Sequence, residues 1–404
     1  MKKIIVFVIS LITIIGLSIL GYNFYRDYQI KHAKKIVKLK DKEIEVYTDI
    51  KLKDLFKKLN GKVVKNFKID TTKIGPQEIN FEYINNDKIR IPYIVEIEIV
   101  DKTPPVISRM NSYSVTVNSL ENDDLEKEFF CGDNYDDNPK CIIEGYYDLS
   151  TVGTYPIVFK GTDQSNNTSS QNITLYVKEK RKSSGSNNNS SEEAYTKYED
   201  IITEYKTDNT KIGIDISHWQ GTIDFKKVKE SGVEFAYIRV GRGNGIGKEY
   251  VLDDRFEEYI KGFNKEKIPV GVYFYSNANS KKDAIKEAKW VLSKIKKYKV
   301  DLEIVFDWEN WSSYQDYSLS FYHLTEMANA FIDTVEEKGY KGMIYASKHY
   351  LENIFFPIEK AVWLAHYTKK TTYEGNYKVW QICNDGKVSG INDNYVDIDI
   401  MYKS

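Results

Sequence analysis

Hydrophobic and polar positions follow three different patterns along the chain of 404 residues. Residues 4–25 form an uncharged run made mainly of Ile, Leu, Val and Phe. Residues 36–180 carry short segments in which apolar and polar positions alternate, and residues 211–404 alternate apolar segments with amphipathic ones. Since the chain is too long for one ordinary domain, these changes of pattern predict several domains in series.

The uncharged run is long enough to cross a bilayer as a helix, which takes about 20 apolar residues. Lys2 and Lys3 precede it, and neither a convincing cleavage site nor a cysteine for lipidation follows it. We therefore expect residues 1–35 to be an uncleaved anchor and juxtamembrane segment of a single-pass cell-membrane protein, with the rest of the chain extracellular. The basic residues after the run favour the opposite orientation, but the very short N-terminal stub and the exported character of the later segments outweigh them; they are Arg26, Lys31, Lys34 and Lys35.

The alternating region predicts two small all-β modules, residues 36–101 and 102–180. Period-two alternation with turn residues between the segments is typical of antiparallel β-sandwiches. A weak internal repeat supports two copies, because residues 70–75 (DTTKIG) resemble residues 148–153 (DLSTVG). The second module also contains DKTPPVI at 101–107, a pattern that resembles bacterial immunoglobulin-like repeats. That resemblance implies a spacer or a wall-binding stalk for both modules, and it is weaker for the first.

The second module contains a pair of cysteines, and a polar segment follows it. Cys131 and Cys141 lie close together in the sequence, which fits a local disulfide in an exported domain, with two unpaired thiols as the alternative. Residues 181–210 include the run SSGSNNNSS at 183–191, which lacks the apolar residues that a core needs. We expect these residues to form a flexible linker.

Residues 211–404 predict an α/β domain. Helices with one apolar face are expected within 281–298 and 318–339. Apolar strands that alternate with such helices predict a largely parallel sheet, and eight strands in this length predict a compact (β/α) barrel of the flattened TIM-like type. The eight candidate strands are 212–216, 235–240, 269–275, 304–307, 342–345, 362–365, 379–382 and 396–400.

Carboxylates gather at the ends of these candidate strands. Asp215 ends the first strand, Asp307 and Glu309 follow the fourth, and Asp397 lies in the last. Barrel enzymes place their chemistry at the carboxyl ends of strands, and two residues apart in extended chain, Asp307 and Glu309 point to the same side. Glycoside hydrolysis needs one protonated carboxylic acid and a second carboxylate, and burial beside like charges raises a pKa enough to keep such a proton. The alternative for a single Asp-x-Glu is a pair of solvated carboxylates.

Composition narrows the classes of partner. The formal net charge is −1, so the chain has no overall positive charge that would favour binding to nucleic acid. Cysteine and histidine do not cluster at the spacing of a metal site, so we expect neither a metal nor a cofactor. The 32 tyrosines fit folded, aromatic-rich domains, in which they can pack in sheets or stack on sugars.

Several motifs, in order, carry a family resemblance. They are GIDISHWQG at 213–221, VGVY at 270–273, DWE at 307–309, VWLAHY at 362–367, and the Trp380, Gln381 and Asp397 positions. Together they resemble family 25 glycoside hydrolases, the Chalaropsis-type lysozymes, over essentially all of 211–404. The resemblance implies a flattened β/α barrel and β-1,4-N-acetylmuramidase activity on peptidoglycan.

The resemblance also implies roles for individual residues. Glu309 resembles the general acid, Asp307 its partner, and Asp215 with Asp397 would complete an acidic floor. Arg239 is interpreted as an ion-pair anchor beside these acids. The predicted substrate-binding positions are Tyr273, Tyr275, Arg239, Trp363, Tyr367 and Gln381.

Some positions keep a second interpretation. Trp363 and Trp380 could equally pack in the barrel core, and His218 and His366 are interpreted as structural hydrogen-bonding residues. The chain departs from the family where Phe274 replaces a common His and Asp399 a common Asn, which touches none of the four acids.

We therefore predict a peptidoglycan hydrolase presented at the cell surface on a membrane-anchored stalk, with glycan strands and the membrane as partners. The alternatives are a non-catalytic cell-wall-binding scaffold and a glycosidase for another polysaccharide. A retaining and an inverting outcome are both compatible with the sequence.

Overall fold

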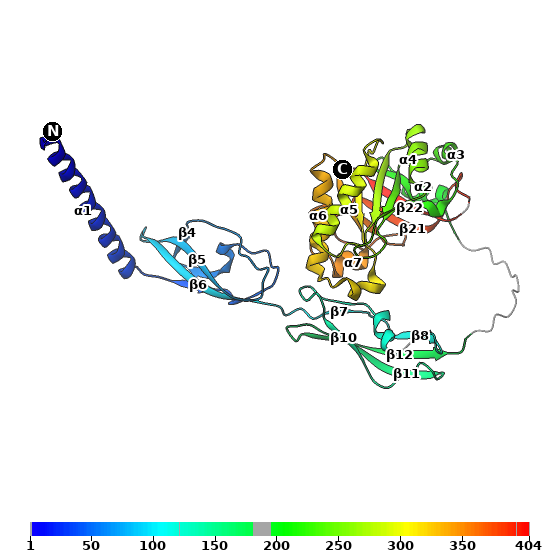
Figure 1. Cartoon of the computed structure of the whole chain (residues 1–404), viewed down its shortest axis with the longest axis horizontal. Coiled ribbons are helices and arrows are strands. Elements are labelled where there is room, and N and C mark those ends of the chain that lie inside the picture. The colour runs from blue at the N-terminus through cyan, green and yellow to red at the C-terminus, as the bar shows by residue number, and fades with distance from the viewer. Residues whose placement is uncertain (1, 121, 181–194, 393, 404) are drawn as a thin grey trace. The chain divides into compact units, whose positions relative to one another are not determined.

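A computed structural model describes residues 2–120, 122–180, 195–392 and 394–403 of the protein (Figure 1). The chain divides into two compact units, Met1–Lys102 and Thr103–Ser404. The predicted linker run at 183–191 lies outside the described residues.

The first unit begins with α1 (Lys2–His32), which continues past the uncharged run into a polar segment containing Arg26 and Asp27. Among the described residues, no helix combines the length and the apolarity that crossing a membrane requires. The predicted membrane anchor of residues 1–35 is therefore wrong, and so are the membrane partner and the single-pass cell-membrane location that depend on it.

The β part of the first unit is built on one long antiparallel hairpin. In this hairpin, Gly75 pairs with Ile99 at one end and Ile84 with Arg90 at the other, and alternate residues such as Phe81 and Tyr83 are buried. A four-stranded sheet forms around it in the order β2 (Glu43–Glu45), β6 (Arg90–Val100), β5 (Gly75–Asn85) and β4 (Gly61–Val63). A separate two-stranded sheet joins β1 (Val37–Leu39) to β3 (Phe56–Leu59), and η1 (Leu52–Leu55) precedes β3.

The second unit begins with another small β module, which contains η2 (Asn122–Glu128). Its four-stranded sheet has the order β10 (Lys140–Glu144), β11 (Gly153–Thr162), β12 (Thr168–Lys178) and β8 (Ser112–Thr116), and β7 (Val106–Ile107) pairs separately with β9 (Cys131–Gly132). Phe129 and Phe159 lie in its core. A disulfide joins Cys131 to Cys141, with the Cα atoms 6.4 Å apart.

The predicted pair of immunoglobulin-like sandwiches is not what these modules form. Each has one four-stranded sheet and one two-stranded ribbon, and each four-stranded sheet contains one parallel pair, β2 with β6 and β8 with β12. Alternation along a strand identifies the buried face, but it does not specify the neighbouring strand or its direction. The strands were predictable and their assembly was not.

The rest of the second unit is a closed sheet of eight strands. Their order around the ring is β14 (Thr210–Ile216), β15 (Ala236–Arg242), β17 (Val270–Tyr275), β18 (Ile304–Asp307), β19 (Gly342–Ser347), β20 (Ala361–Ala365), β21 (Val379–Lys387) and β22 (Val396–Tyr402). β22 pairs with both β21 and β14, which closes the ring. Two short strands extend the sheet: β13 (Thr196–Lys197) beside β21 and β16 (Val251–Leu252) beside β15.

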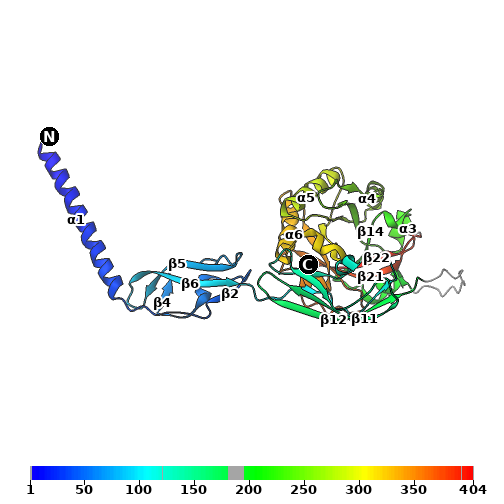
Figure 2. The ribbon, with the colours of Figure 1, turned by 60° about the horizontal axis from the view of Figure 1, so that its bottom comes forward.

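The predicted TIM-like (β/α) barrel is also a wrong fold class. The strands β14 to β21 are parallel to their neighbours, but β22 is antiparallel to both of its own. Only residues 388–395 connect β21 to β22, which is too short for the crossover that a parallel pair needs. The helices between the strands are α3 (Phe225–Glu230), α4 (Phe256–Lys265), α5 (Lys281–Ile295), α6 (Phe321–Glu336) and α7 (Lys348–Asn353). In the described residues, no helix follows β20. Figure 2 shows α4, α5 and α6 outside the strands.

The barrel begins before residue 211, because part of the expected linker is folded onto it. Residues 195–210 include β13 and α2 (Tyr198–Tyr205). Tyr198 is fully buried, and its hydroxyl donates a hydrogen bond of 3.0 Å to the carbonyl of Ile212.

Large side chains fill the inside of the ring. Phe235, Tyr237, Met343 and Trp363 belong to one buried cluster there, while their strand neighbours, such as Ile238 and Leu364, pack toward the helices. This alternation follows from the period of two along a strand. Side chains therefore fill the inside of the ring, and a site for a ligand can form only at its end.

Candidate active site

The strand directions bring the predicted acids to one end of the barrel. Asp307 is the last residue of β18, and Asp215 is the second to last of β14. Asp397 is near the start of β22, but because β22 is antiparallel, its start lies beside the end of β14, and Asp397 pairs in register with Asp215. Glu309 follows two residues after β18.

These four acids line one cavity of about 230 Å³. Five of the six predicted substrate-binding residues line it too, namely Arg239, Tyr273, Tyr275, Trp363 and Gln381. The sixth, Tyr367, lines a neighbouring cavity instead. Tyr345 and Trp219 also line the cavity but were not predicted as site residues. Tyr345 is an aromatic residue at a strand end, and Trp219 lies in the GIDISHWQG motif, so both positions carried a signal.

Gln381 organises the bottom of this cavity through its amide group. The hydroxyls of Tyr345 and Tyr367 each donate a hydrogen bond of 2.9 Å to Gln381 Oε1. Since the amide oxygen accepts both, the amide nitrogen faces the other way and donates to Asp215 Oδ2 at 2.8 Å. This network fixes the orientation of the Asp215 carboxyl group.

Arg239 has a different ion-pair partner from the one expected. Its Nη2 lies 2.8 Å from Asp253 Oδ2, and both side chains are almost fully buried. His218 Nδ1 lies 3.2 Å from the same oxygen, in keeping with a structural role. Asp253 therefore anchors Arg239 at the cavity wall, and the positive charge of Arg239 acts on Asp307 through space, where it opposes the rise of that pKa.

Burial raises the pKa of every acid in the cavity. For Asp215 burial is the largest cause, and the nearby Asp397 and Asp399 add to it. Burial likewise raises the pKa of Glu309 and, together with the charge of Glu309, that of Asp307. Burial raises the pKa of Asp397 to about 6. Protons therefore remain on some of these groups near neutral pH.

Asp399 shows how the chain accommodates a departure from the family pattern. It is fully buried, and Trp363 Nε1 donates a hydrogen bond of 2.8 Å to its Oδ1. Burial is the largest cause that raises its pKa well above the ordinary value. A neutral carboxylic acid has nearly the size and the hydrogen-bonding pattern of an asparagine amide, so Asp399 can take the place of the common Asn.

Trp363 and Trp380, which could each bind sugar or pack in the core, differ in position. Trp363 is buried, packs on Tyr237 with ring centroids 4.6 Å apart, and still lines the cavity. Trp380 is buried as well, but its Nε1 donates to the carbonyl of His366 and it does not line either cavity of the site. Trp380 is a core residue.

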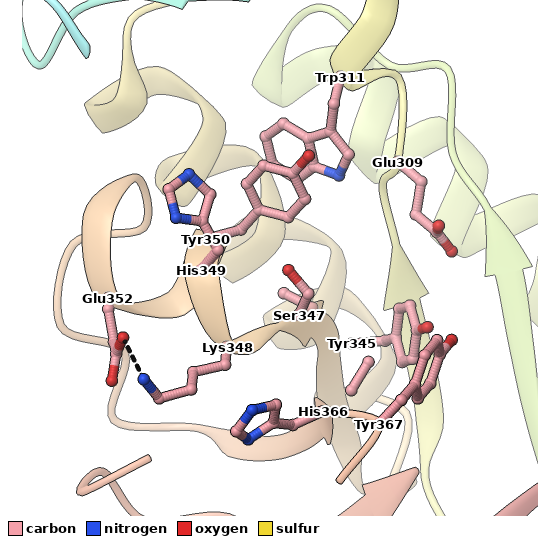
Figure 3. Close-up of a pocket in the computed structure, with 12 residues that line it drawn as sticks. Glu309, Trp311, Tyr345, Ser347, Lys348, His349, Tyr350, Glu352, His366 and Tyr367 are labelled. Carbon is pink, nitrogen blue, oxygen red and sulfur yellow. Dashed lines mark ion pairs between the residues drawn. The ribbon is translucent and has the colours of Figure 1, made fainter. Parts of the chain in front are cut away.

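A second cavity of about 460 Å³ continues from the first. Glu309 and Tyr345 line both cavities, so the two are adjacent, and we refer to them together as the groove. Figure 3 shows the second cavity, in which Trp311 stacks on Tyr350 with ring centroids 3.6 Å apart and Lys348 pairs with Glu352 at 3.0 Å. Neither Trp311 nor Tyr350 was predicted as a site residue from the sequence.

This arrangement suits acid catalysis on a chain-like substrate. A carboxyl group that keeps a proton can donate it to a leaving oxygen, and neighbouring carboxylates can stabilise positive charge on the carbon left behind. The second cavity is lined by the partly exposed rings of Trp311 and Tyr350 and the exposed ring of Tyr367, which offer flat surfaces for sugars. The geometry thus fits glycoside chemistry.

Comparisons with known proteins agree with this chemistry. Residues 214–391 match the model of the family described as Glycosyl hydrolases family 25. The autolytic lysozyme of Clostridium acetobutylicum is 28% identical over 190 residues, which cover 46% of this chain and 54% of the relative. Lysozyme M1 of Streptomyces globisporus is 39% identical over 69 residues, which cover 17% of this chain and 21% of the relative.

A solved structure adds a further likeness. The modular autolysin LytC from Streptococcus pneumoniae, in complex with a synthetic peptidoglycan ligand, is 30% identical with a TM-score of 0.44 and covers 49% of this chain and 48% of that one. The chain thus spans about half or less of the length of these relatives. The family resemblance is confirmed for the barrel: residues 214–391 belong to glycosyl hydrolases family 25.

Proposed function

We propose that the barrel hydrolyses the β-1,4 bond between N-acetylmuramic acid and N-acetylglucosamine in peptidoglycan. The observation that carries the proposal is the convergence of Asp215, Asp307, Glu309 and Asp397 on one cavity at the mouth of the ring. The name of the Clostridium relative, an autolytic lysozyme, supports peptidoglycan as the substrate.

Glu309 would act as the general acid. It lines both cavities, so a glycosidic oxygen placed over it has one sugar in each. Burial raises the pKa of Glu309, which keeps a proton available for the leaving oxygen. The sugar that becomes positively charged would occupy the smaller cavity, where the other three acids lie.

Asp397 would supply most of the negative charge that stabilises the positive sugar, because the pKa values of Asp215 and Asp307 are raised well above the ordinary value. Asp307 and Glu309 line the same cavity, and the charge of Glu309 adds to the rise of the Asp307 pKa, so the two carboxyl groups act on each other. Asp215 is held by Gln381, and Asp397, whose pKa is raised to about 6, is largely ionised at neutral pH. Preorganised charge of this kind is worth most in a site shielded from water.

The substrate-binding residues would act from the walls. Tyr275 is held in its neutral form, because burial, with the charges of Asp307 and Glu309, raises its pKa far above neutrality. Its hydroxyl can therefore donate a hydrogen bond to the sugar. Trp363 forms part of the floor, and Tyr367 lies at the edge of the second cavity.

The test is digestion of purified peptidoglycan by the full chain, followed by mass spectrometry of the new reducing ends. The wild type should produce muramic acid at these ends, and Glu309→Gln should lower the rate by roughly 100-fold or more, as loss of a general acid does. Glu326→Gln is the matched control, because Glu326 lies on the outside of the barrel and pairs with Lys281. N-acetylglucosamine at the new ends, or an undiminished rate in Glu309→Gln, would contradict the proposal.

A further inference from the structure

The β module at the start of the second unit is packed against the wall of the groove. The ring of Phe130 in this module lies beside three aromatic rings of the barrel. The distances between ring centroids are 5.1 Å to Tyr314, 6.3 Å to Phe321, which is stacked, and 6.4 Å to Trp311, which is edge-on. Phe130 packs in this way against the barrel's own core. The contact is therefore continuous with the core of the catalytic domain.

Hydrogen bonds from the module complete a helix of the barrel. The first N–H groups of a helix have no acceptor within it. At the start of α6, the N–H of Phe321 donates to the carbonyl of Asp133 at 2.8 Å, and the N–H of Ser320 donates to Asp137 Oδ1 at 2.6 Å. The module thus supplies acceptors that the start of α6 lacks.

Close approach of the module to the aromatic rings of the barrel depends on a glycine. A Cβ atom on Gly132 would lie 2.6 Å from the ring of Phe321 and 2.7 Å from the ring of Tyr314. Both distances are shorter than carbon atoms tolerate. Residue 132 therefore fits this surface only without a side chain.

The segment that the module supports carries part of the groove wall. This segment is η4 (Trp311–Tyr317), which is interrupted by non-helical angles at Ser313 and ends at Ser318 in a left-handed conformation. Its first residue, Trp311, stacks on Tyr350 in the second cavity and contacts Phe130. Because the segment is short and irregular, its position depends on what packs against it.

We propose that Phe130 is a positioning residue for the substrate groove. Phe130 holds the η4 segment in place, and this contact positions the Trp311 ring to bind glycan. The module of residues 103–180 then belongs to the glycan-binding apparatus and does more than separate the barrel from other parts of the chain. This inference depends on the proposed function for the identity of the ligand.

The test measures binding in full-length protein that carries Glu309→Gln, so that the ligand is not consumed. The probe is a soluble peptidoglycan tetrasaccharide, and the Kd is obtained by calorimetry. Adding Phe130→Ala should raise the Kd about 3- to 10-fold, which is the range that loss of an aromatic pair produces. Phe130→Tyr, which keeps the ring, should retain a Kd near that of the parent.

Two further variants show whether the effect passes through Trp311. If it does, adding Phe130→Ala to a Trp311→Ala protein should change the Kd much less than adding it to the parent, because coupled residues are not additive. Tyr146→Ala is the control for the module, since Tyr146 is exposed on the same module and should leave the Kd unchanged. If thermal unfolding shows that Phe130→Ala does not fold, Phe130→Leu replaces it.

The outcomes separate the two proposals. A parent protein that does not bind the tetrasaccharide overturns the proposed substrate and this inference with it. A parent that binds, combined with an unchanged Kd in the Phe130 variant, overturns the inference alone. Equal effects of the Phe130 change with and without Trp311 also overturn it, because Phe130 would then act by another route.

Discussion

Asp215 on β14 lies directly opposite Asp397 on β22 in an antiparallel pair of strands. Two carboxyl groups at such neighbouring positions repel each other when both are ionised. Their pKa values reflect this, because burial raises that of Asp215 and the charge of Asp397 raises it further. The reversed direction of the last strand is therefore what brings Asp397 to the mouth of the barrel beside Asp215.

The amide of Gln381 should be needed to hold Asp215. Gln381→Leu removes the hydrogen bond to Asp215 Oδ2 and the acceptor for two tyrosine hydroxyls. We expect kcat on peptidoglycan to fall by roughly 10- to 100-fold, since small misplacements of catalytic groups are costly. Tyr345→Phe alone should have a smaller effect, because Tyr367 still donates to the same oxygen. A Gln381→Leu protein with the wild-type rate would show that Asp215 needs no such support.

Removing the charge of Asp397 should shift the pH dependence of activity. Asp397→Asn takes away a neighbouring negative charge, so the pKa of Asp215 should fall. If ionised Asp215 supports the positive charge on the sugar, the acid limb of kcat/KM moves to lower pH while the maximum rate decreases. The measurement is a pH–rate profile of wall lysis, with Asp254→Asn, an exposed aspartate, as the control. An acid limb that moves to higher pH would count against this role.

The ion pair between Asp137 and His323 should stabilise the barrel most strongly at mildly acidic pH. The hydrogen bond to Asp137 is the main cause that raises the pKa of His323 above 6.5. Stability from this shift is fully present below pH 6.5 and is lost as the pH rises through the higher pKa of the folded state. Burial alone would raise the pKa of Asp137, but hydrogen bonds from His323 and Ser320 outweigh it and lower the pKa below 3.8. Stability from that shift is present above pH 3.8 and is lost as the pH falls through the lower value.

Both contributions are thus present between about pH 4 and pH 6.5. Asp137→Asn should lower the Tm at pH 5.5 by about 1 to 2 °C, since a half-exposed pair contributes under about 1 kcal/mol, and should lower it less at pH 8.5. Tryptophan fluorescence is a suitable readout because all six tryptophans of the chain lie in the barrel. Lys226→Gln, which breaks an exposed pair with Glu230, is a control that should show little change. An equal loss at both pH values would mean that charge is not involved.

Local patterns in the sequence were enough to predict several features of the barrel. The apolar segments gave the number of strands in the ring, and the placement of Asp307 and Glu309 after one of them predicted acids at the mouth. These features are predictable because strand periodicity and the position of polar residues at strand ends are properties of short segments. The membrane anchor was wrong although it rested on an equally local pattern, because no described helix combines the length and the apolarity of a membrane span.

What the sequence determined by itself is therefore the set of strands, the chemical type of the site and the family of the barrel. The tertiary structure alone decided the antiparallel direction of β22, the anchoring of Arg239 by Asp253 and the packing of Phe130 beside Trp311. Each of these joins segments that are not adjacent in the chain, and no local pattern records which distant surface a segment will meet. Such contacts are selected by the shape and burial of the whole fold.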